Sequence, residues 1–278
     1  MNIIVAEHCG FCYGVKRAVK MAQEAAEQHV HGGTYGPLIH NPQLIEELAA
    51  GGISCKENLK DFASGETAIF RSHGVGPEIY AQAEQLGLKI LDATCPNVRL
   101  AQKKASQAAA DGYFPIIVGE KNHPEVKSIL KWAGENAICV EYIEDVSSVP
   151  QKERYGVVIQ TTFELKKFEA ILRALQEQRP GEYRVDRTIC MATSQRQKAA
   201  LELADKCDAV IVIGGRNSAN TRHLYELVAE RCKKAYHIET AAELSKEMLR
   251  DCHNIGITAG ASTPDRLIKE AIIAMENM

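Results

Sequence analysis

Three cysteines, Cys12, Cys95 and Cys190, each stand shortly before a long helical pattern, one in each third of the chain. The strings around them are Cys-Tyr-Gly-Val-Lys-Arg, Asp-Ala-Thr-Cys-Pro and Thr-Ile-Cys-Met-Ala-Thr. The dipole of a helix favours the thiolate form of a cysteine at its amino end. If the three positions face one centre, three thiolates would suit an iron–sulfur cube with one iron left free for substrate. The alternative is that each is a small buried apolar residue, as most free cysteines are.

The other six cysteines make a weaker case for chemistry. Cys9 forms the string Cys9-Gly-Phe-Cys12, a spacing known from redox disulfides and from half of a zinc site, but the sequence has no second such pair. A thiol redox sensor or a zinc-stabilised binding module is therefore the non-enzymatic alternative. The remaining five lie in apolar or helical patterns typical of packing, namely Cys55, Cys139, Cys207, Cys232 and Cys252.

Polar side chains gather in six short segments that follow strand-like runs. Helix starts present free N–H groups and a partial positive charge, which suit a phosphate. Ser, Thr and Asn at such places could instead be simple helix caps. Three histidines and several hydroxyls together would hold a diphosphate without a cluster of lysines. The segments are His40-Asn41-Pro42, Ser72-His73-Gly74-Val75-Gly76-Pro77, Asn122-His123-Pro124-Glu125, Gln160-Thr161-Thr162, Asn217-Ser218-Ala219-Asn220-Thr221 and Gly260-Ala261-Ser262-Thr263-Pro264.

Glu125 is the carboxylate within these segments that could give or take a proton. At a helix start, its alternative role is to complement the helix dipole. In a closed cavity beside an anion the pKa of Glu125 should rise, which would make it a candidate general acid. Asp92 is expected to have a structural role. The polar residues that flank two of the cysteines are predicted to be solvated or to support the site from behind: Lys16, Arg17, Arg196 and Gln197.

The composition is that of an ordinary soluble globular protein, with 278 residues, 45% hydrophobic and 25% charged. A net charge of −3 offers no positive field for nucleic acid or an acidic membrane. The first residues place an acidic side chain where a signal peptide needs its apolar run, and no stretch approaches a membrane span. We therefore expect a cytoplasmic protein in a reducing compartment, where cysteines act as thiols.

The elements that must position these residues predict an α/β protein with parallel sheets. Their order repeats three times, which predicts three similar units over residues 1–95, including the N-terminal strand and Cys12, 96–190 and 191–278. Ligands of parallel sheets bind beyond the carboxyl ends of strands, so the loops and cysteines are expected to share one cavity. Short continuous apolar runs predict strands at 2–5, 68–71, 88–91, 115–118, 138–142, 156–159, 209–213 and 254–258, and the repeated order adds a short strand before 68–71 and a strand near 235–238. Helical patterns lie at 15–28, 78–86, 98–110, 164–178, 193–206, 221–231 and 264–277.

These strings, in this order, closely resemble the 4-hydroxy-3-methylbut-2-enyl diphosphate reductases (the IspH/LytB family), which catalyse the last step of the methylerythritol phosphate route to isoprenoids. The resemblance covers essentially the whole chain, from Gly10-Phe11-Cys12 to Thr263-Pro264. The motifs that carry it are Gly-Phe-Cys-x-Gly-Val-x-Arg-Ala, His-Asn, Ser-His-Gly-Val, Asp-Ala-Thr-Cys-Pro, His-Pro-Glu-Val, Gln-Thr-Thr, Cys-x-Ala-Thr-x-x-Arg-Gln and Asn-Ser-x-Asn.

The resemblance implies three α/β units in a pseudo-threefold trefoil around a central [4Fe–4S] cluster. Cys12, Cys95 and Cys190 would be its ligands, and the fourth iron would stay open for the allylic oxygen of the substrate. Ala219 stands where a serine is common, so its backbone N–H must serve there or one contact with the anion is missing. The other residues implied to hold the diphosphate are His40, His73, His123, Ser218, Asn220 and Ser262.

The resemblance also implies the reaction. Two electrons, delivered by a donor such as ferredoxin or flavodoxin, would break the allylic C–O bond, while Glu125 supplies protons through Thr161. Isopentenyl and dimethylallyl diphosphate would be the products, with water released. An alternative of another enzyme class is quinolinate synthase, which has a similar three-unit plan and three cysteines but different motifs. None of these enzymes implies a nucleic acid or a membrane partner.

Overall fold

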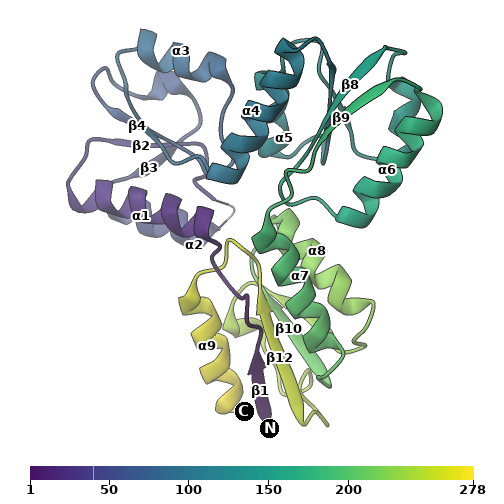
Figure 1. The fold of residues 1–278 in the computed structure, drawn as a ribbon. Coiled ribbons are helices and arrows are strands. Elements are labelled where there is room, and N and C mark those ends of the chain that lie inside the picture. Colours follow the sequence, from purple (N-terminus) through teal and green to yellow (C-terminus); the bar gives the residue numbers. More distant parts are fainter. Residues whose placement is uncertain (40) are drawn as a thin grey trace. The chain divides into compact units, whose positions relative to one another are not determined.

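The computed structural model describes residues 1–39 and 41–278. Strands and helices alternate along the chain and build three four-stranded sheets, in which every strand pair of the described residues is parallel (Figure 1). The chain divides into two compact units. The first consists of Met1–Lys16, Ile39–Glu47 and Met191–Met278, and the second of Arg17–Leu38 and Leu48–Cys190.

One sheet of the second unit has the strand order β3-β2-β4-β5. The ring of Phe70 and the helix residue Ala83 are fully buried in the cluster on one face of this sheet. The strands are β2 (Gly32–Tyr35), β3 (Ser54–Lys56), β4 (Thr67–Phe70) and β5 (Lys89–Asp92). The helices of this stretch are α1 (Tyr13–Glu27), α2 (Pro42–Ala50), the short 3-10 helix η1 (Leu59–Asp61) and α3 (Pro77–Gln85).

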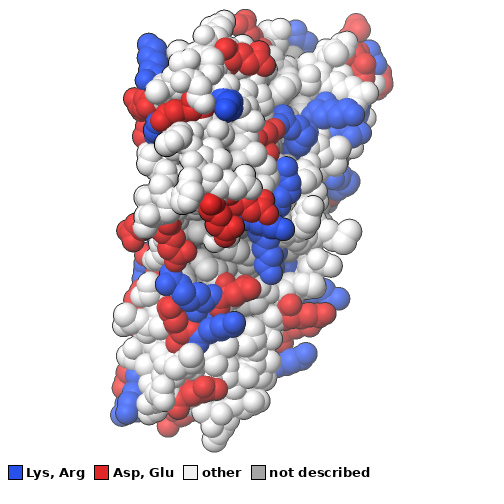
Figure 2. Space-filling model, turned by 90° about the vertical axis from the view of Figure 1, so that its left-hand side faces the viewer, with Lys and Arg blue, Asp and Glu red and all other residues white. Residues whose placement is uncertain are grey.

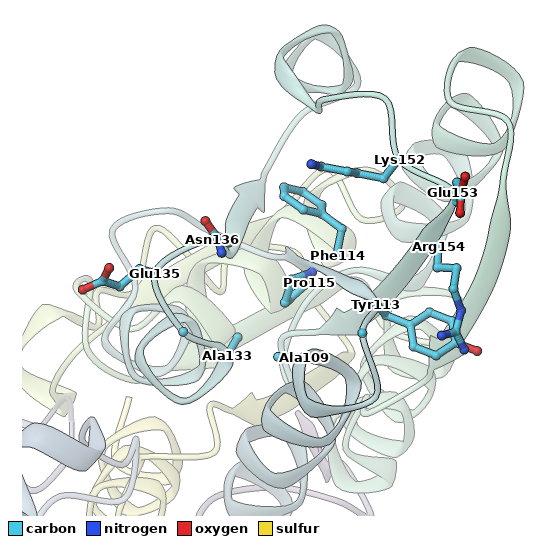
Figure 3. A pocket seen from close by; sticks show the side chains of 12 residues that line it. Ala109, Tyr113, Phe114, Pro115, Ala133, Glu135, Asn136, Lys152, Glu153 and Arg154 are labelled. Atoms are coloured by element: carbon cyan, nitrogen blue, oxygen red, sulfur yellow. The ribbon is translucent and has the colours of Figure 1, made fainter.

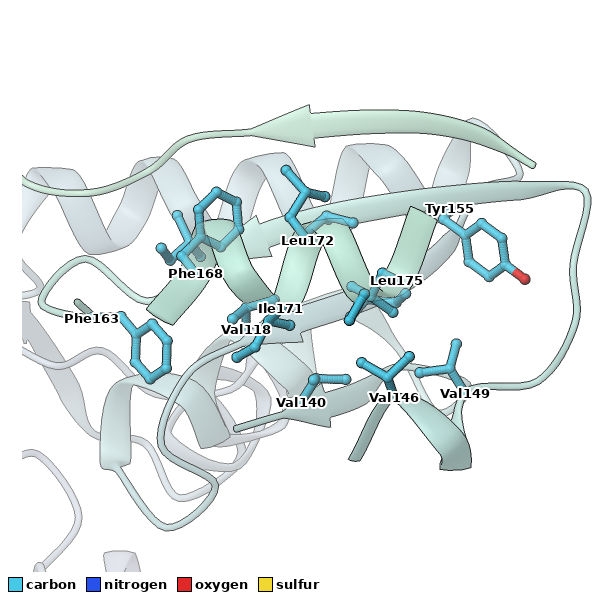
Figure 4. Packing of buried hydrophobic residues seen from close by; sticks show 14 residues of the cluster. Val118, Val140, Val146, Val149, Tyr155, Phe163, Phe168, Ile171, Leu172 and Leu175 are labelled. Carbon is cyan, nitrogen blue, oxygen red and sulfur yellow. The ribbon is translucent and has the colours of Figure 1, made fainter. Parts of the chain in front are cut away.

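The other sheet of the second unit has the order β7-β6-β8-β9 and is covered on both faces. On one face Ile159 and Phe168 belong to a cluster of buried hydrophobic residues between the sheet and helix α6 (Leu165–Gln178) (Figure 4). On the other face Val158 packs with Ala105 of α4 and Ile129 of α5. The strands are β6 (Phe114–Val118), β7 (Ile138–Val140), β8 (Arg154–Ile159) and β9 (Glu182–Asp186). The helices are α4 (Pro96–Ala110), α5 (Pro124–Ala133), the 3-10 helix η2 (Ile143–Ser148) and α6 (Leu165–Gln178).

The sheet of the first unit has the order β1-β12-β10-β11 and is also covered on both faces (Figure 1). Ile257 and Leu267 lie in a cluster between the sheet and α9, whereas Val212 packs with Leu203 of α7 and Leu224 of α8. The strands are β1 (Asn2–Val5), β10 (Ala209–Ile213), β11 (Ala235–Ile238) and β12 (Asn254–Ala259). The helices are α7 (Met191–Ala204), α8 (Ala219–Ala229), the 3-10 helix η3 (Ala241–Glu243) and α9 (Asp265–Glu276).

The predicted α/β class with three similar parallel units is confirmed, because the three sheets share one strand order. In each sheet an edge strand leads toward a cysteine, namely β5, β9 and β1. The sequence analysis assigned the N-terminal strand to the unit of residues 1–95, but β1 pairs with β12, Val5 standing opposite Ile257. An apolar run predicts a strand, whereas its partner is set by register with a distant segment. The unit boundaries at 95/96 and 190/191 stay predictions.

Two further strands, β2 and β9, were not predicted, because neither contains a continuous apolar run. The string Gly32-Gly33-Thr34-Tyr35 begins with two glycines and so shows no apolar run. The neighbouring strand lies too close for a side chain at Gly33, where a Cβ would clash with the carbonyl of Ser54. The strand β9 lies at an edge of its sheet and reads Glu-Tyr-Arg-Val-Asp.

On the face shown in Figure 2, basic and acidic side chains are interspersed. None of the helices in the described parts of the chain is long and apolar enough to cross a membrane.

Candidate functional site

Each of the three cysteines is tied to the loop of the neighbouring strand by its own backbone N–H. The N–H of Cys12 donates to the carbonyl of Ala261 at 3.1 Å. The corresponding bonds run from Cys95 to Ser72 at 2.9 Å and from Cys190 to Thr161 at 2.8 Å. All three acceptors lie in segments that the sequence analysis selected as binding loops. The repeat of the fold therefore extends to the hydrogen bonds that attach each cysteine to a predicted binding loop.

The surroundings of the cysteines suit thiolates. All nine cysteines of the described chain are free thiols, and these three are partly exposed. Cys95 is the N-cap of α4, with Pro96 as its first helical residue. The sulfur of Cys12 accepts the backbone N–H of Val15 at 3.5 Å, and the sulfur of Cys190 accepts the side-chain N–H of Asn97 at 3.0 Å.

Burial disfavours the thiolate form of Cys9 and of Cys139. Burial raises the pKa of the Cys9 thiol to about 12, against the opposing charge of Arg196. Burial likewise raises the pKa of Cys139 to about 12, with Glu141 adding to the effect. A thiol that stays protonated at neutral pH is a poor metal ligand. Both residues therefore fit packing roles, as predicted for Cys139.

The three cysteines are divided between the two units, Cys12 in the first and Cys95 and Cys190 in the second. The bond from Asn97 to Cys190 brings the first turn of α4, two residues beyond Cys95, to the Cys190 sulfur. Within either unit, the described residues hold no group of three His, Cys, Asp or Glu close enough to bind a metal ion. The meeting of all three cysteines at one centre stays a prediction.

Glu125 and Thr161 form a buried pair at the carboxyl ends of β6 and β8. The side chain of Glu125 is buried, and its oxygens accept the backbone N–H of Thr161 at 2.6 Å and the Thr161 hydroxyl at 2.9 Å. Burial raises the pKa of Glu125 from 4.5 to about 7; the two hydrogen bonds oppose this shift and the nearby charge of Glu120 adds to it. A carboxyl group with such a pKa can hold a proton at neutral pH and release it.

Two of the predicted histidines lie beside this pair. The rings of His73 and His123 meet edge to face, with their centroids 5.5 Å apart. Nδ1 of His123 accepts the backbone N–H of Glu125 at 3.2 Å and so caps α5. A neutral His123 must then carry its proton on Nε2. In this tautomer Nε2 is a hydrogen-bond donor, the kind of group that an anion binds.

The loop of His73 is fixed by the backbone that follows it. Gly74 has φ +74, and a Cβ there would clash with the side-chain amide of Gln102. The indole N–H of Trp132, on α5, donates to the carbonyl of Val75 at 2.9 Å. These contacts connect the His73 loop to the helices that follow Cys95 and His123, and they hold the backbone just after His73.

The approach to Cys95 is held by a charged cluster that confirms a structural role for Asp92. One carboxylate oxygen of Asp92 accepts the backbone N–H of Thr94 at 3.0 Å, and the other is paired with Arg99. Arg17 donates to the carbonyl of Thr94 at 3.1 Å. The residue before Cys95 is therefore held through both its N–H and its carbonyl.

The remaining predicted binding residues lie in the first unit, after β10 and β12. Ser218 is the N-cap of α8, and its hydroxyl oxygen lies 3.4 Å from the hydroxyl of Ser262. Ala219 is the first residue of that helix. Nδ2 of Asn220 is buried and has no hydrogen-bond partner among the described residues. A buried donor without a partner costs free energy unless a ligand satisfies it, so Asn220 is suited to an anion. His40 lies outside the described residues.

Arg196 is buried, so of its two predicted roles, solvated or supporting the site from behind, the structure agrees with the second. Its guanidinium donates to the carbonyl of Gly10 at 2.7 Å and to the carbonyl of Ala192 at 3.0 Å. The arginine thus joins the loop before Cys12 to the first turn of α7. Its place beside Cys190 in the sequence gave no sign that it would hold the loop of Cys12.

A separate cavity of about 570 Å³ lies at the amino ends of β6 and β8, at the sheet edge opposite the predicted loops (Figure 3). Arg154 stacks on the ring of Tyr113 there and is paired with Glu182. None of the predicted site residues lines it. Its lining includes the carboxylates of Glu135 and Glu153, whose negative charge disfavours a diphosphate.

Comparison with known proteins identifies the family. The family model described as "LytB protein" matches residues 3–276. A 4-hydroxy-3-methylbut-2-enyl diphosphate reductase of Aquifex aeolicus is 43% identical over 275 residues, covering 97% of this chain and 94% of that protein. One of the same name from Pelobacter propionicus is also 43% identical, covering 98% and 96%.

Solved structures agree with the sequence match. A structure of (E)-4-hydroxy-3-methyl-but-2-enyl diphosphate reductase, described as the terminal enzyme of the non-mevalonate pathway, is 42% identical, with a TM-score of 0.77 and full coverage of both chains. A Plasmodium falciparum reductase acting on the E-1-hydroxy-2-methyl-but-2-enyl-4-diphosphate has a TM-score of 0.90 at 27% identity and covers 98% of this chain and 87% of that one. The chain therefore belongs to the LytB protein family.

Proposed function

We propose that this chain is a reductase that removes the allylic hydroxyl of 4-hydroxy-3-methylbut-2-enyl diphosphate. Two electrons and two protons are consumed, the C–O bond breaks, and isopentenyl or dimethylallyl diphosphate forms together with one water. The observation that carries the proposal is the buried Glu125–Thr161 pair. Burial raises the pKa of the Glu125 carboxyl to about 7, which suits proton delivery at neutral pH. Thr161 also accepts the backbone N–H of Cys190, which joins this pair to a predicted metal ligand.

The residues present fit an iron–sulfur cluster, which we propose to be a [4Fe–4S] cluster with one open iron. Cys12, Cys95 and Cys190 form no disulfide in the described structure, are partly exposed, and stand at helix starts. The sulfurs of Cys12 and Cys190 accept N–H hydrogen bonds, which stabilise a thiolate. When bound, such a cluster supplies electrons and a Lewis-acid iron.

The diphosphate of the substrate would be bound mainly by neutral donors. In the second unit these are His73 and His123, whose rings meet edge to face; with Nδ1 of His123 accepting the N–H of Glu125, Nε2 of His123 is the donor. In the first unit the donors are the hydroxyls of Ser218 and Ser262, the unpartnered amide of Asn220 and the backbone N–H of Ala219 at the start of α8. His40 is proposed with them. Helix starts add their partial positive charge to both groups.

Proton delivery follows from the orientation of the pair. With Glu125 ionised, the Thr161 hydroxyl donates to it; with Glu125 protonated, the direction reverses and the hydroxyl can pass a proton on. Thr161 is too weak an acid to be the net source, so its role is a relay. Burial of both side chains keeps bulk water from competing for that proton.

The proposed partners are small. The substrate is an allylic diphosphate, and the electrons would come from a soluble carrier such as ferredoxin or flavodoxin. We propose the cytoplasm as the location, where the thiols would stay reduced. Nucleic acid and membrane are not among the proposed partners.

The test is anaerobic purification followed by an absorbance spectrum, an iron count and a turnover assay with a reduced dye as electron donor. We expect a brown protein whose spectrum changes with the allylic diphosphate and which forms the two isomeric products. A colourless, iron-free protein would instead support the thiol-sensor or zinc-module alternative. An iron-loaded protein that ignores the allylic diphosphate would refute the substrate while leaving the metal in place.

A further inference from the structure

Asn97 makes a side-chain contact with one of the predicted metal ligands. It is the second residue of α4, after Cys95 as N-cap and Pro96 as the first helical position. Its amide nitrogen donates to the sulfur of Cys190 at 3.0 Å. Neither the family motifs nor the spacing of the cysteines involves Asn97.

Both ends of this hydrogen bond are held in place. On the donor side, Cys95 is attached to Ser72, and Pro96 fixes the backbone as it enters α4. On the acceptor side, the backbone N–H of Cys190 is bonded to Thr161. The amide needs little further ordering to reach the sulfur, which offsets the competition from water at its exposed side chain.

The orientation of the amide follows from chemistry. The oxygen and nitrogen of an asparagine side chain are assigned from their partners. A thiolate sulfur can only accept, so the amide oxygen facing it would set lone pairs against a negative charge. The N–H orientation is therefore the one that a thiolate, and hence a metal-bound sulfur, requires.

We propose that Asn97 is a positioning residue that hydrogen-bonds the Cys190 thiolate and raises the reduction potential of the cluster bound there. This inference rests on the proposed cofactor. Reduction adds negative charge that spreads onto the ligand sulfurs, so a donor to sulfur stabilises the reduced form more than the oxidised form. An electron donor of a given potential would then keep a larger fraction of the enzyme reduced.

The test compares Asn97→Leu and Asn97→Asp with the wild-type holoenzyme. Leucine has a similar size and no N–H, whereas aspartate keeps the shape and replaces the donor by a negative charge. We expect the reduced-to-oxidised ratio at a fixed potential to fall about tenfold in Asn97→Leu, equivalent to about 59 mV for one electron. The fall should be larger in Asn97→Asp. The readout is a poised redox titration followed by absorbance, with iron counted per chain.

Gln107→Leu is the matched control, because it removes an exposed amide from the same helix. Its potential should equal that of the wild type. An unchanged potential in an iron-loaded, active Asn97→Leu protein would overturn the role of Asn97 and leave the proposed function intact. Iron-free wild-type protein would overturn the cofactor and this role together.

Loss of iron from Asn97→Leu is also informative when Asn97→Gln is measured beside it. Glutamine keeps the N–H donor on a longer side chain. Recovery of iron in Asn97→Gln would support the hydrogen bond as the feature that matters. Loss of iron in both variants would overturn it, because the donor would then not be what retains the cluster.

Discussion

Thr161 contacts both carboxylate oxygens of Glu125, one through its backbone N–H at 2.6 Å and the other through its hydroxyl at 2.9 Å. The carbonyl of the same threonine accepts the backbone N–H of Cys190 at 2.8 Å. One residue at the end of β8 thus orients the proposed acid and anchors a proposed metal ligand. A shift of this loop would disturb proton delivery and metal binding together.

Replacing Glu125 by glutamine should stop the reaction after substrate binding. Glutamine keeps the size and the hydrogen-bonding reach but carries no acidic proton, and loss of a general acid typically lowers the rate about 10²–10⁴-fold. A role limited to the helix dipole would cost only about 0.3–1 kcal/mol of stability. The measurement is single-turnover rate together with substrate affinity, which should be nearly unchanged.

Glu177→Gln, at the exposed end of α6, is the control for adding an amide to this unit. It should turn over like the wild type. If Glu125→Gln also retained near wild-type rate with an unaltered pH profile, another group would have to deliver the proton.

The raised pKa of Glu125 should make stability fall as the pH rises. Below pH 4.5 the carboxyl is protonated in both folded and unfolded chains; between pH 4.5 and about 7 the unfolded chain ionises while the folded one does not. Stability is therefore lost across this window, by at most about 3 kcal/mol, and changes little above it.

Chemical denaturation of the metal-free protein between pH 4 and 8 measures this dependence. The difference between wild type and Glu125→Gln isolates the contribution of one group, since the glutamine cannot titrate. A difference that stays constant over the whole range would mean that Glu125 has an ordinary pKa in the folded chain. Turnover should fall in parallel as the pH passes 7, because the acid is then ionised.

Loss of the Asn220 amide should weaken binding of the diphosphate. Its Nδ2 is buried without a partner in the described structure, and a hydrogen bond to a charged group contributes about 1.5–3 kcal/mol. We expect the Kd of the substrate to rise about one to two decades in Asn220→Ala. Asn277→Ala removes an exposed amide at the end of α9, outside the predicted binding loops, and should leave the Kd unchanged. Equal affinity in the two variants would place the anion elsewhere.

Serine in place of Cys95 should lower the iron content sharply, because a hydroxyl is a poor substitute for a thiolate ligand. Cys139→Ser is the control, since its sulfur is directed at the carbonyl of Gly119 and its pKa is raised by burial. Iron counted per chain after anaerobic reconstitution decides between them. Full retention of iron in Cys95→Ser would remove it from the ligand set.

Sequence reasoning reached the parts of the site that depend on local pattern. The junction at Cys95 and the loops of His73, His123 and Thr161 follow short apolar runs and precede helices as predicted. Cys190 also precedes a helix as predicted, but the strand before it, β9, was missed. The sheet of β1 and the hydrogen bond of Asn97 depend on register and on contacts between segments far apart in the chain, which have no local signature. The resemblance to a known family gave roles that residue spacing alone could not assign.

Arg196→Met should destabilise the first unit and loosen the loop that carries Cys12. The buried guanidinium satisfies the carbonyls of Gly10 and Ala192, and a buried group left without a partner costs about 1–3 kcal/mol. Lysine cannot span both carbonyls as the planar fork does, so Arg196→Lys should recover little. Lys198→Met, at an exposed position of the same helix, is the matched control.

Denaturation of the metal-free Arg196→Met protein gives its stability, and iron counted per chain reports on the Cys12 loop. Because Gly10 is only two residues from Cys12, we expect iron content to fall even at temperatures where the variant is fully folded. Normal iron content and stability in Arg196→Met would show that the bond to Gly10 holds nothing the metal needs.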